Sequence, residues 1–593
     1  RHHHKRKHVV VIVDCRIGYA AYDVHLCLQF GSSRRDLDSN AKIRANIILK
    51  DQICCNLAWS SQAIPNTTCY DKMLSLNPQR RKRFLLFKEL GIPGPEPSFF
   101  SGNTAEILSK GSVKAFDEWT KKFGDIVGFY NGGTPVLIVK NTELLRKIQV
   151  KDFGNFASRG VVSVASRHHR IARTSLTNAP SERWKEMRSL MTPAFKPSSM
   201  KCMLSLVESC VDTFMKVVAA KKTEAVSMEV RELFQKLSMD IIARSAFGTE
   251  TGIQQSRGGT AADTLLDLIQ DRLGEYKNGW LMYFANCFPE FYYLWRFLFS
   301  RGKHSVMTPT DYIKNNLASL IEERRANKQA EREDLLQLML NAEEEADSLI
   351  DVQQLTVGHE EEEVACASLE SVPVIRKRRF MTITEIQSNA VMFLVAGFET
   401  TGTTLSFTSY LLAKHPDIQE RTRKEILSVI KDENGLTYDS LTKMPYLDQV
   451  ISEALRYYPV VVGFITRKCD QEYEYKGIKI PSGMSILVPA FQMHHDPKLW
   501  NDPEAFIPER FSTENRSKIE PMAYQAYGNG PRNCVAMRFA QLVLKFTLAK
   551  LLSTYELVLD PNKHKGDLKI GSSFTLAYPL DGVWLKLQEA HES

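Results

Sequence analysis

A single long helix constrains the fold of this chain more than any other feature. The stretch TITEIQSNAVMFLVAGFETTGTTLSFTSYLLAKHP begins with Thr382 and Glu385 in capping-box spacing and contains no proline before Pro416. A helix of roughly 33 residues is about 50 Å long. An element of that length crosses a whole domain, so we expect it to lie at the centre of the fold.

The middle of this helix has an unusual composition. In the stretch AGFETT, Ala396 and Gly397 remove side-chain bulk, while Glu399 and Thr400 introduce polar groups. A helix can open its hydrogen-bond ladder at such a place and admit a ligand or water. A buried helix that tolerates polar residues has the same pattern, and this stretch alone does not decide between the two interpretations.

Long helical patterns dominate most of the chain, and short strand-like runs such as 134–140 and 485–490 interrupt them. The sequence therefore predicts a mainly α fold with a minor β subdomain, which we assign to residues 101–593. Within it, residues 341–379 are rich in acidic residues and lack hydrophobic periodicity. They are predicted to form a disordered acidic insertion.

The first hundred residues differ from this pattern. Residues 1–76 hold no apolar run of the about 20 residues that a membrane-spanning helix needs, and we treat them as an undefined, disordered extension. Residues 77–100 combine the basic cluster RRKR with Pro93, Pro95 and Pro97, which cannot be helical. This segment is either an ordinary linker or a hinge that orients the domain on a membrane.

Charge and cysteine content exclude some classes of function. The 77 basic and 69 acidic residues give a net charge of +8, which is too dispersed to argue for a nucleic-acid partner. The 11 cysteines form no CxxC pair. They indicate reduced thiols rather than a disulfide framework.

One cysteine stands in a distinctive setting. In the stretch AYGNGPRNCVAMRFA, Gly528 and Gly530 give the loop conformational freedom, and Arg532 places a positive charge two residues before Cys534. A thiolate at the start of the following apolar helix gains from free N–H groups, which lower its pKa and suit it to bind a metal. A buried cysteine that acts as a small hydrophobe is the alternative. Neither a zinc site nor a histidine base is evident beside it.

Three charged residues in two motifs are candidates for an ion-pair network. The helix MPYLDQVISEALRYYP places Glu453 and Arg456 at i,i+3 on one face, and the segment DPEAFIPERF supplies Arg510. Both guanidinium groups can reach the same carboxylate. An exposed pair of this kind is common and worth only a few tenths of a kcal/mol, so the spacing alone proves no role.

Taken in order, AGFETT, EALR, PERF and YGNGPRNCVA resemble the motifs of the cytochromes P-450. These are haem-thiolate monooxygenases with the signature Phe-x-x-Gly-x-Arg-x-Cys-x-Gly, and the resemblance covers the chain from about residue 84 to its end. The stretches LGIPGPEPSFFSGN, ERWKEMRSLMTPAF and DLLQLML are most similar to the animal group that contains the 3A drug-metabolising enzymes and thromboxane synthase. The resemblance implies the cytochrome P-450 fold and haem b as cofactor.

The resemblance also implies roles for single residues. Cys534 matches the axial ligand of the haem iron, and Glu399 and Thr400 match the pair that activates oxygen. Glu453, Arg456 and Arg510 match a buried network that braces the haem loop. Five further residues match positions that hold the haem propionates, namely Arg159, Trp184, Arg188, Arg467 and Arg532. Three others match positions beside the haem ring, namely Ala396, Gly397 and Tyr527.

The sequence departs from the family pattern in two signature positions. Tyr527 replaces the signature Phe and needs a partner for its hydroxyl, and Ala536 replaces the final Gly and adds a methyl group near the haem. We expect both to be tolerated, with a changed haem affinity or potential as the cost. The apolar anchor that microsomal members carry before the proline hinge is not evident here.

The resemblance leads to a function. The expected reaction inserts one oxygen atom of O2 into a lipophilic small molecule, and NADPH supplies the electrons. Because no NADPH or flavin fingerprint occurs, the electrons must come from a separate protein. The resemblance to microsomal members implies NADPH–cytochrome P-450 reductase as that donor, with cytochrome b5 as a second one. Both are acidic partners that Lys185 and Lys196 could steer. The expected location is the cytosolic face of the endoplasmic reticulum membrane.

Two other functions stay open at this point. One is a haem-thiolate isomerase similar to thromboxane synthase, which needs no reductase. The other is a haem-binding protein without catalysis. In the leading interpretation, the substrate pocket draws on five segments, numbered 161–175, 278–299, 393–400, 460–464 and 573–574.

Overall fold

The computed structural model divides the chain into two units, residues 1–78 and 79–593. The residues that it describes are 9–18, 21–30, 78–160, 174–224, 227–256, 258, 283, 286–288, 309–326, 334–344, 380–572 and 575–590.

The first unit contains an antiparallel hairpin of β1 (Val9–Gly18) and β2 (Ala21–Phe30), in which Val9 lies opposite Phe30. We expected residues 1–76 to lack ordered structure, and these two strands differ from that expectation. The run VVVIV at the start of β1 explains the difference locally, because β-branched residues favour strands. The rest of the predicted extension lies outside the described residues.

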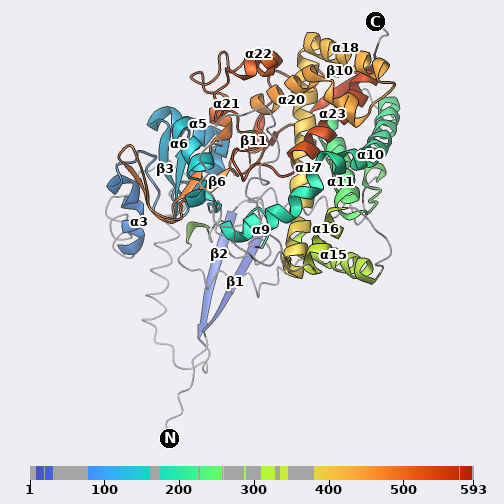
Figure 1. Ribbon diagram of the computed structural model, residues 1–593. Coiled ribbons are helices and arrows are strands. Elements are labelled where there is room, and N and C mark those ends of the chain that lie inside the picture. Colours follow the sequence, from blue (N-terminus) through green and yellow to red (C-terminus); the bar gives the residue numbers. More distant parts are fainter. Residues whose placement is uncertain are drawn as a thin grey trace. The chain divides into compact units, whose positions relative to one another are not determined.

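Helix α17 (Ile383–Lys414) is the long central helix that the sequence predicts. Thr382 caps it, and the Glu385 side chain bonds back to the Thr382 N–H, so the predicted capping box is present. Figure 1 shows α17 running through the middle of the second unit, with α11 (Val230–Phe247) alongside it. Most of the apolar stretch of α17 is buried within the unit, as expected for a core helix.

The second unit is mainly helical, which confirms the predicted fold class. Its other α-helices are α3 (Pro78–Glu89), α4 (Thr104–Lys110), α5 (Ser112–Phe123), α6 (Thr142–Arg146), α9 (Ser181–Met191), α10 (Pro197–Glu224), α15 (Pro309–Ala326), α16 (Leu335–Glu344), α18 (Pro416–Asp432), α19 (Tyr438–Thr442), α20 (Pro445–Tyr457), α21 (Ala490–His494), α22 (Thr513–Arg516) and α23 (Met537–Thr554). Shorter helical turns are η1 (Lys147–Lys151), η2 (Phe153–Phe156), η3 (Thr192–Phe195), η4 (Ile253–Gln255) and η7 (Pro508–Phe511).

The largest sheet of the second unit has the strand order β3-β4-β9-β6. Its strands are β3 (Ile126–Asn131), β4 (Thr134–Val139), β9 (Ser485–Leu487) and β6 (Thr466–Lys468). Strands β4 and β9, which the sequence predicted, pair in parallel. The smaller sheets comprise β10 (Tyr555–Leu559), β13 (Trp584–Glu589) and β5 (Met228–Glu229), β11 (Ile570–Ser572) with β12 (Ala577–Pro579), and β7 (Tyr473–Tyr475) with β8 (Ile478–Ile480).

The basic cluster of the predicted hinge forms part of helix α3. Arg80 is buried rather than solvated: it donates to the carbonyl oxygens of Phe99 at 2.7 Å and Cys287 at 2.6 Å. The first bond attaches α3 to the segment that follows the prolines, and the second attaches it to Cys287, far along the chain. Residues 341–344 of the predicted acidic insertion end helix α16, and residues 345–379 lie outside the described part of the chain.

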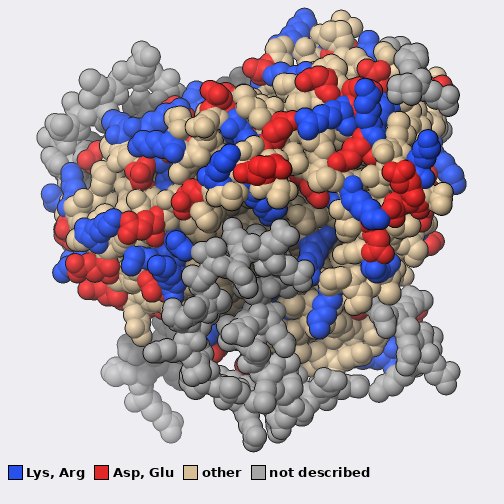
Figure 2. Space-filling view, turned by 45° about the horizontal axis from the view of Figure 1, so that its top comes forward, with Lys and Arg blue, Asp and Glu red and all other residues tan. Residues whose placement is uncertain are grey.

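Charged side chains of both signs are interspersed on the face of the molecule in Figure 2. Three of the segments predicted to line a substrate pocket fall wholly or largely outside the described residues, namely 161–175, 278–299 and 573–574.

Candidate haem-binding site

The loop before α23 depends on glycine. Gly528 and Gly530 both have φ near +72°, a conformation that side-chain-bearing residues rarely adopt. A Cβ at Gly530 would lie 1.8 Å from the carbonyl oxygen of Gln149, so this close approach also requires glycine. The Cys534 N–H donates to the Tyr527 carbonyl oxygen at 2.9 Å and closes the loop. Cys534 is thereby presented at the edge of a cavity.

Burial raises the pKa of the Cys534 thiol above its ordinary value. The N–H of Ala536 and the positive charges of Arg188 and Arg159 act in the opposite direction. The N–H group therefore lowers the thiol pKa as predicted, but the loss of solvation outweighs it and the two cations.

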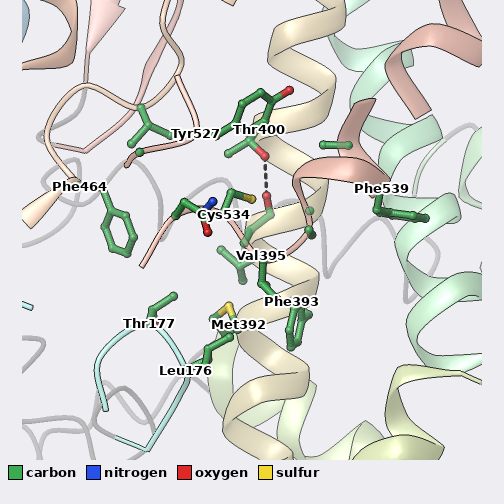
Figure 3. Close-up of a pocket in the computed structure, with 18 of the residues that line it drawn as sticks. Leu176, Thr177, Met392, Phe393, Val395, Thr400, Phe464, Tyr527, Cys534 and Phe539 are labelled. Carbon is green, nitrogen blue, oxygen red and sulfur yellow. Dashed lines mark hydrogen bonds between the residues drawn. The ribbon is translucent and has the colours of Figure 1, made fainter. Parts of the chain in front are cut away.

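The cavity beside Cys534 has a volume of about 490 Å³. In Figure 3, Cys534 and Tyr527 lie near Thr400 of α17, while Phe464, Leu176 and Thr177 border the cavity from other segments. The lining is largely apolar and draws on residues more than 300 positions apart in the chain. The α17 residues that line it are Ser388, Val391, Met392, Phe393, Val395, Ala396, Gly397, Thr400, Thr401 and Thr404.

Four arginines that the sequence singled out border this cavity together with Trp184. Arg532 donates to the carbonyl oxygens of Thr177 and Ala179, and its guanidinium carbon lies 4.6 Å from the Trp184 ring. The other three also donate to carbonyl oxygens: Arg159 to Phe464, Arg188 to Asn533 and Arg467 to Thr466 and Asn529.

The same arginines leave hydrogen-bonding capacity unused. The Nε atoms of Arg159, Arg188, Arg467 and Arg532 are buried and have no hydrogen-bond partner among the described residues. Burial lowers the pKa of Arg188 to about 10. Burial together with a neighbouring arginine lowers the pKa of Arg159 to about 10 and that of Arg467 to about 9. No aspartate or glutamate lines the cavity among the described residues. Four such cations beside an apolar cavity and a thiol fit a flat apolar group with carboxylates, as haem b is.

Glu399 and Thr400 lie in different environments. The Thr400 hydroxyl borders the cavity and donates to the Ala396 carbonyl oxygen at 2.7 Å (Figure 3). The Glu399 carboxylate is buried and does not line the cavity: it accepts bonds from Arg231 at 2.8 Å and Gln235 at 2.6 Å, both on α11. The side chains of consecutive helical residues point about 100° apart, so Thr400 faces the cavity while Glu399 faces α11. No pattern in the sequence indicates Arg231 or Gln235 as partners of Glu399, because both are more than 160 positions away.

The predicted charged residues around Glu453 come together in the interior. Glu453 and Arg456 have no exposed side-chain surface, and Arg456 binds both carboxylate oxygens of Glu453 at 2.8 Å. Arg510 Nε reaches the same carboxylate at 3.3 Å, and the N–H of Ile507 donates to it at 3.0 Å. Glu453 and Arg456 therefore do not form an exposed ion pair on the surface.

His494 extends this network in a way that the sequence analysis missed. Its Nε2 accepts a bond from the Gln525 N–H at 2.8 Å, and its Nδ1 lies 3.1 Å from the Arg456 carbonyl oxygen. It thus joins the Glu453 network to the chain just before the cysteine loop. Burial holds the pKa of His494 well below its usual range.

The two departures from the signature behave differently. Ala536 has φ −98° and ψ 22°, a conformation open to any residue, so its methyl group brings no backbone strain. The Tyr527 ring lines the cavity, but its hydroxyl is buried and has no hydrogen-bond partner. The sequence predicted that this hydroxyl needs a partner, and the described residues provide none.

Comparison with known proteins matches residues 92–582 to the family model Cytochrome P450. The chain is 31% identical to Cytochrome P450 3A11 of Mus musculus over 477 residues, which is 79% of this chain and 86% of that protein. It is 32% identical to Cytochrome P450 3A2 of Rattus norvegicus over 481 residues, with the same two coverages, 79% and 86%. It is also 32% identical to Lithocholate 6-beta-hydroxylase of Mesocricetus auratus over 476 residues, again covering 79% and 86% of the two chains.

Proposed function

The chain belongs to the cytochrome P450 monooxygenase family, and we propose that it oxidises lipophilic small molecules at the cavity beside Cys534. The observation that carries this proposal is the combination of a buried thiol, an apolar cavity and four arginines with unpaired Nε atoms. The substrate class is a xenobiotic, a steroid or a fatty-acid-like molecule. The similarity to proteins named as 3A forms and as a lithocholate hydroxylase supports this class.

Cys534 would supply the thiolate ligand of the haem iron. The residues that would hold the propionates are Arg159, Arg188, Arg467, Arg532 and Trp184. When bound, haem would supply the chemistry of oxygen activation, which a thiolate ligand favours. The carboxylates would pair with the buried guanidinium groups and relieve the repulsion among them. Ala396, Gly397 and Tyr527 would border the ring.

Thr400 and Glu399 would handle protons. The Thr400 hydroxyl now donates to the Ala396 carbonyl oxygen, and by rotating it could donate into the cavity instead. The Glu399 carboxylate would act from behind the helix, where Arg231 and Gln235 hold it and Thr403 lies 3.4 Å away. Glu453, Arg456 and Arg510 would keep the cysteine loop in place and take no part in the chemistry.

Electrons would come from a separate protein. We propose NADPH–cytochrome P-450 reductase as the donor, with cytochrome b5 as an additional one, at the cytosolic face of the endoplasmic reticulum membrane. Lys196 is exposed, while Lys185 is partly buried and pairs with Glu182 at 3.1 Å. Lys196 is therefore the better candidate to steer an acidic partner.

An isomerase is the second candidate, because the Glu399 carboxylate faces α11 rather than the cavity. A rearrangement of a peroxide needs no proton relay and no reductase. The experiment that separates the two adds reductase and NADPH to the haem-loaded protein with a panel of steroids, fatty acids and xenobiotics. Substrate-dependent NADPH consumption and an oxygenated product support the monooxygenase, whereas conversion of a peroxide without NADPH supports the isomerase.

The proposed ligand has its own test. The reduced carbon monoxide complex of the wild type should show the red-shifted Soret band of thiolate ligation, and Cys534→Ser should abolish it. An unchanged band in the variant would exclude Cys534 as the ligand. A variant without any haem spectrum would be examined by carbon monoxide binding after haem is added to the purified protein.

A further inference from the structure

Phe464 is fixed by an arginine that also borders the cavity. Arg159 Nη1 donates to the Phe464 carbonyl oxygen at 3.0 Å, and the guanidinium carbon of Arg159 lies 4.4 Å from the centre of the Phe464 ring. One cation thus holds both the backbone and the ring of a single residue. The Nε of the same guanidinium has no partner and stays available to a carboxylate.

The backbone beside Phe464 is also fixed. The N–H groups of Val462 and Gly463 both donate to the Thr575 carbonyl oxygen, at 3.0 and 3.2 Å. Ile465, on the other side, is buried in a hydrophobic cluster. The Phe464 ring therefore stands on a backbone that is held from both directions, so little conformational entropy is lost when a ligand packs against it.

The ring remains accessible from the cavity. Phe464 is half-buried and lines the cavity, and Figure 3 shows its ring apart from Met392 and Val395 of α17, with open space between them. Arg159 covers one face of the ring. The cavity lining therefore includes an aromatic side chain at Phe464, and Met392 and Val395 add a thioether and a branched aliphatic side chain.

This arrangement favours one kind of ligand. A cation over one ring face draws π-electron density toward itself, so the accessible side of the ring binds a second, electron-rich ring more strongly. The Met392 sulfur in the cavity lining also makes favourable contacts with aromatic rings. A saturated ring of equal size gains neither contribution. We propose that Phe464 is a specificity-determining residue that selects substrates carrying a flat aromatic ring, an inference that rests on the function proposed above.

The test uses two probes with the same number of carbon atoms, phenylimidazole and cyclohexylimidazole. Both bind a haem iron through the imidazole nitrogen, so each affinity is measured by spectral titration of the haem-loaded protein, without turnover. The quantity of interest is the ratio of the two affinities, because differences in iron binding largely cancel in it. We expect Phe464→Leu to lower the phenyl-to-cyclohexyl ratio by about threefold to tenfold relative to the wild type.

Phe464→Tyr keeps the aromatic face and should retain the wild-type ratio. Phe393→Leu removes another aromatic residue of the cavity, one that Arg159 does not contact, and should change the ratio by less than Phe464→Leu does. If Phe464→Leu does not load haem, Phe464→Met serves as the second non-aromatic variant. An unchanged ratio in the non-aromatic variants, or a larger change in Phe393→Leu, overturns the inference. If neither probe shifts the wild-type spectrum, the proposed haem site fails instead.

Discussion

At the scale of single residues, the Tyr527 hydroxyl lies in an environment that a comparison of sequence motifs does not show. Two tyrosines three positions apart have opposite hydrogen-bonding states: Tyr524 donates to the Ser452 carbonyl oxygen at 3.2 Å, whereas the Tyr527 hydroxyl is buried without a partner. A buried donor without a partner loses its bonds to water and gains none in return.

We therefore predict that Tyr527→Phe stabilises the protein, by about 1 kcal/mol in the free energy of unfolding measured in urea. The matched control is Tyr524→Phe, which removes a made hydrogen bond and should destabilise the protein by about the same amount. Destabilisation by Tyr527→Phe would mean that this hydroxyl has a partner after all, for example an ordered water.

Thr400 carries the prediction on mechanism. Thr400→Ala removes one hydroxyl at the cavity and leaves the packing of α17 largely intact, so stability should change little. With reductase and a substrate that is turned over, the variant should still consume NADPH, while product per NADPH falls several-fold and hydrogen peroxide rises.

Thr408→Ala is the control for this measurement. Thr408 makes the same type of bond, to the Thr404 carbonyl oxygen, but does not line the cavity. Its replacement should leave the coupling of NADPH to product as in the wild type. Equal coupling in the wild type and Thr400→Ala would remove Thr400 from the mechanism.

At the scale of elements, local sequence rules were sufficient where the relevant groups lie close together in the chain. The capping box fixed the start of α17, and the glycines of the cysteine loop have the positive φ values that their positions require. The contacts between distant elements were not predictable, because no local pattern indicates which helices become neighbours. Arg231 holds Glu399, and His494 connects Arg456 to Gln525, only through the packing of elements far apart in sequence.

The position of His494 between two elements leads to a prediction on pH. Its pKa lies well below the ordinary value in the folded protein, because burial disfavours the charged imidazole and the positive charge of Arg456 acts in the same direction. In the unfolded chain the same group takes up a proton below about pH 6.5. The unfolded state then binds more protons, so this residue makes the folded state less stable as the pH falls, by up to about 1.4 kcal/mol per pH unit.

His494→Gln removes this titration and keeps an acceptor and a donor near the same positions. The free energy of unfolding of the variant should therefore fall less steeply between pH 7 and pH 5 than that of the wild type, even if it is lower at pH 7. Urea unfolding at several pH values measures both slopes. Parallel slopes would show that His494 is not the group that titrates.

At the scale of the whole molecule, the chain divides near residue 78, and the family model matches it from residue 92. The contacts of helix α3 lie within the second unit. Arg80 of this helix is buried. Phe87 packs so closely against Gly128 of β3 that a Cβ added at Gly128 would lie 2.4 Å from the Phe87 ring. The sequence predicted the mainly helical fold and assigned the basic cluster to a linker or hinge. The burial of Arg80 was not predictable, because it depends on carbonyl groups supplied by residues 99, 100 and 287.

The final prediction compares two truncations that differ only by this helix. Deleting residues 1–76 removes none of the described contacts of α3, so haem incorporation and the carbon monoxide spectrum should match those of the full chain. Deleting residues 1–91 also removes Arg80 and Phe87, which leaves buried carbonyl oxygens without a donor and uncovers the apolar surface around Gly128. The shorter protein should lose several degrees in its thermal midpoint and incorporate less haem.

If the two truncations behave alike and both match the full chain, α3 is not part of the stable core. If both lose the carbon monoxide spectrum, residues 1–76 contribute to folding and the domain boundary lies elsewhere.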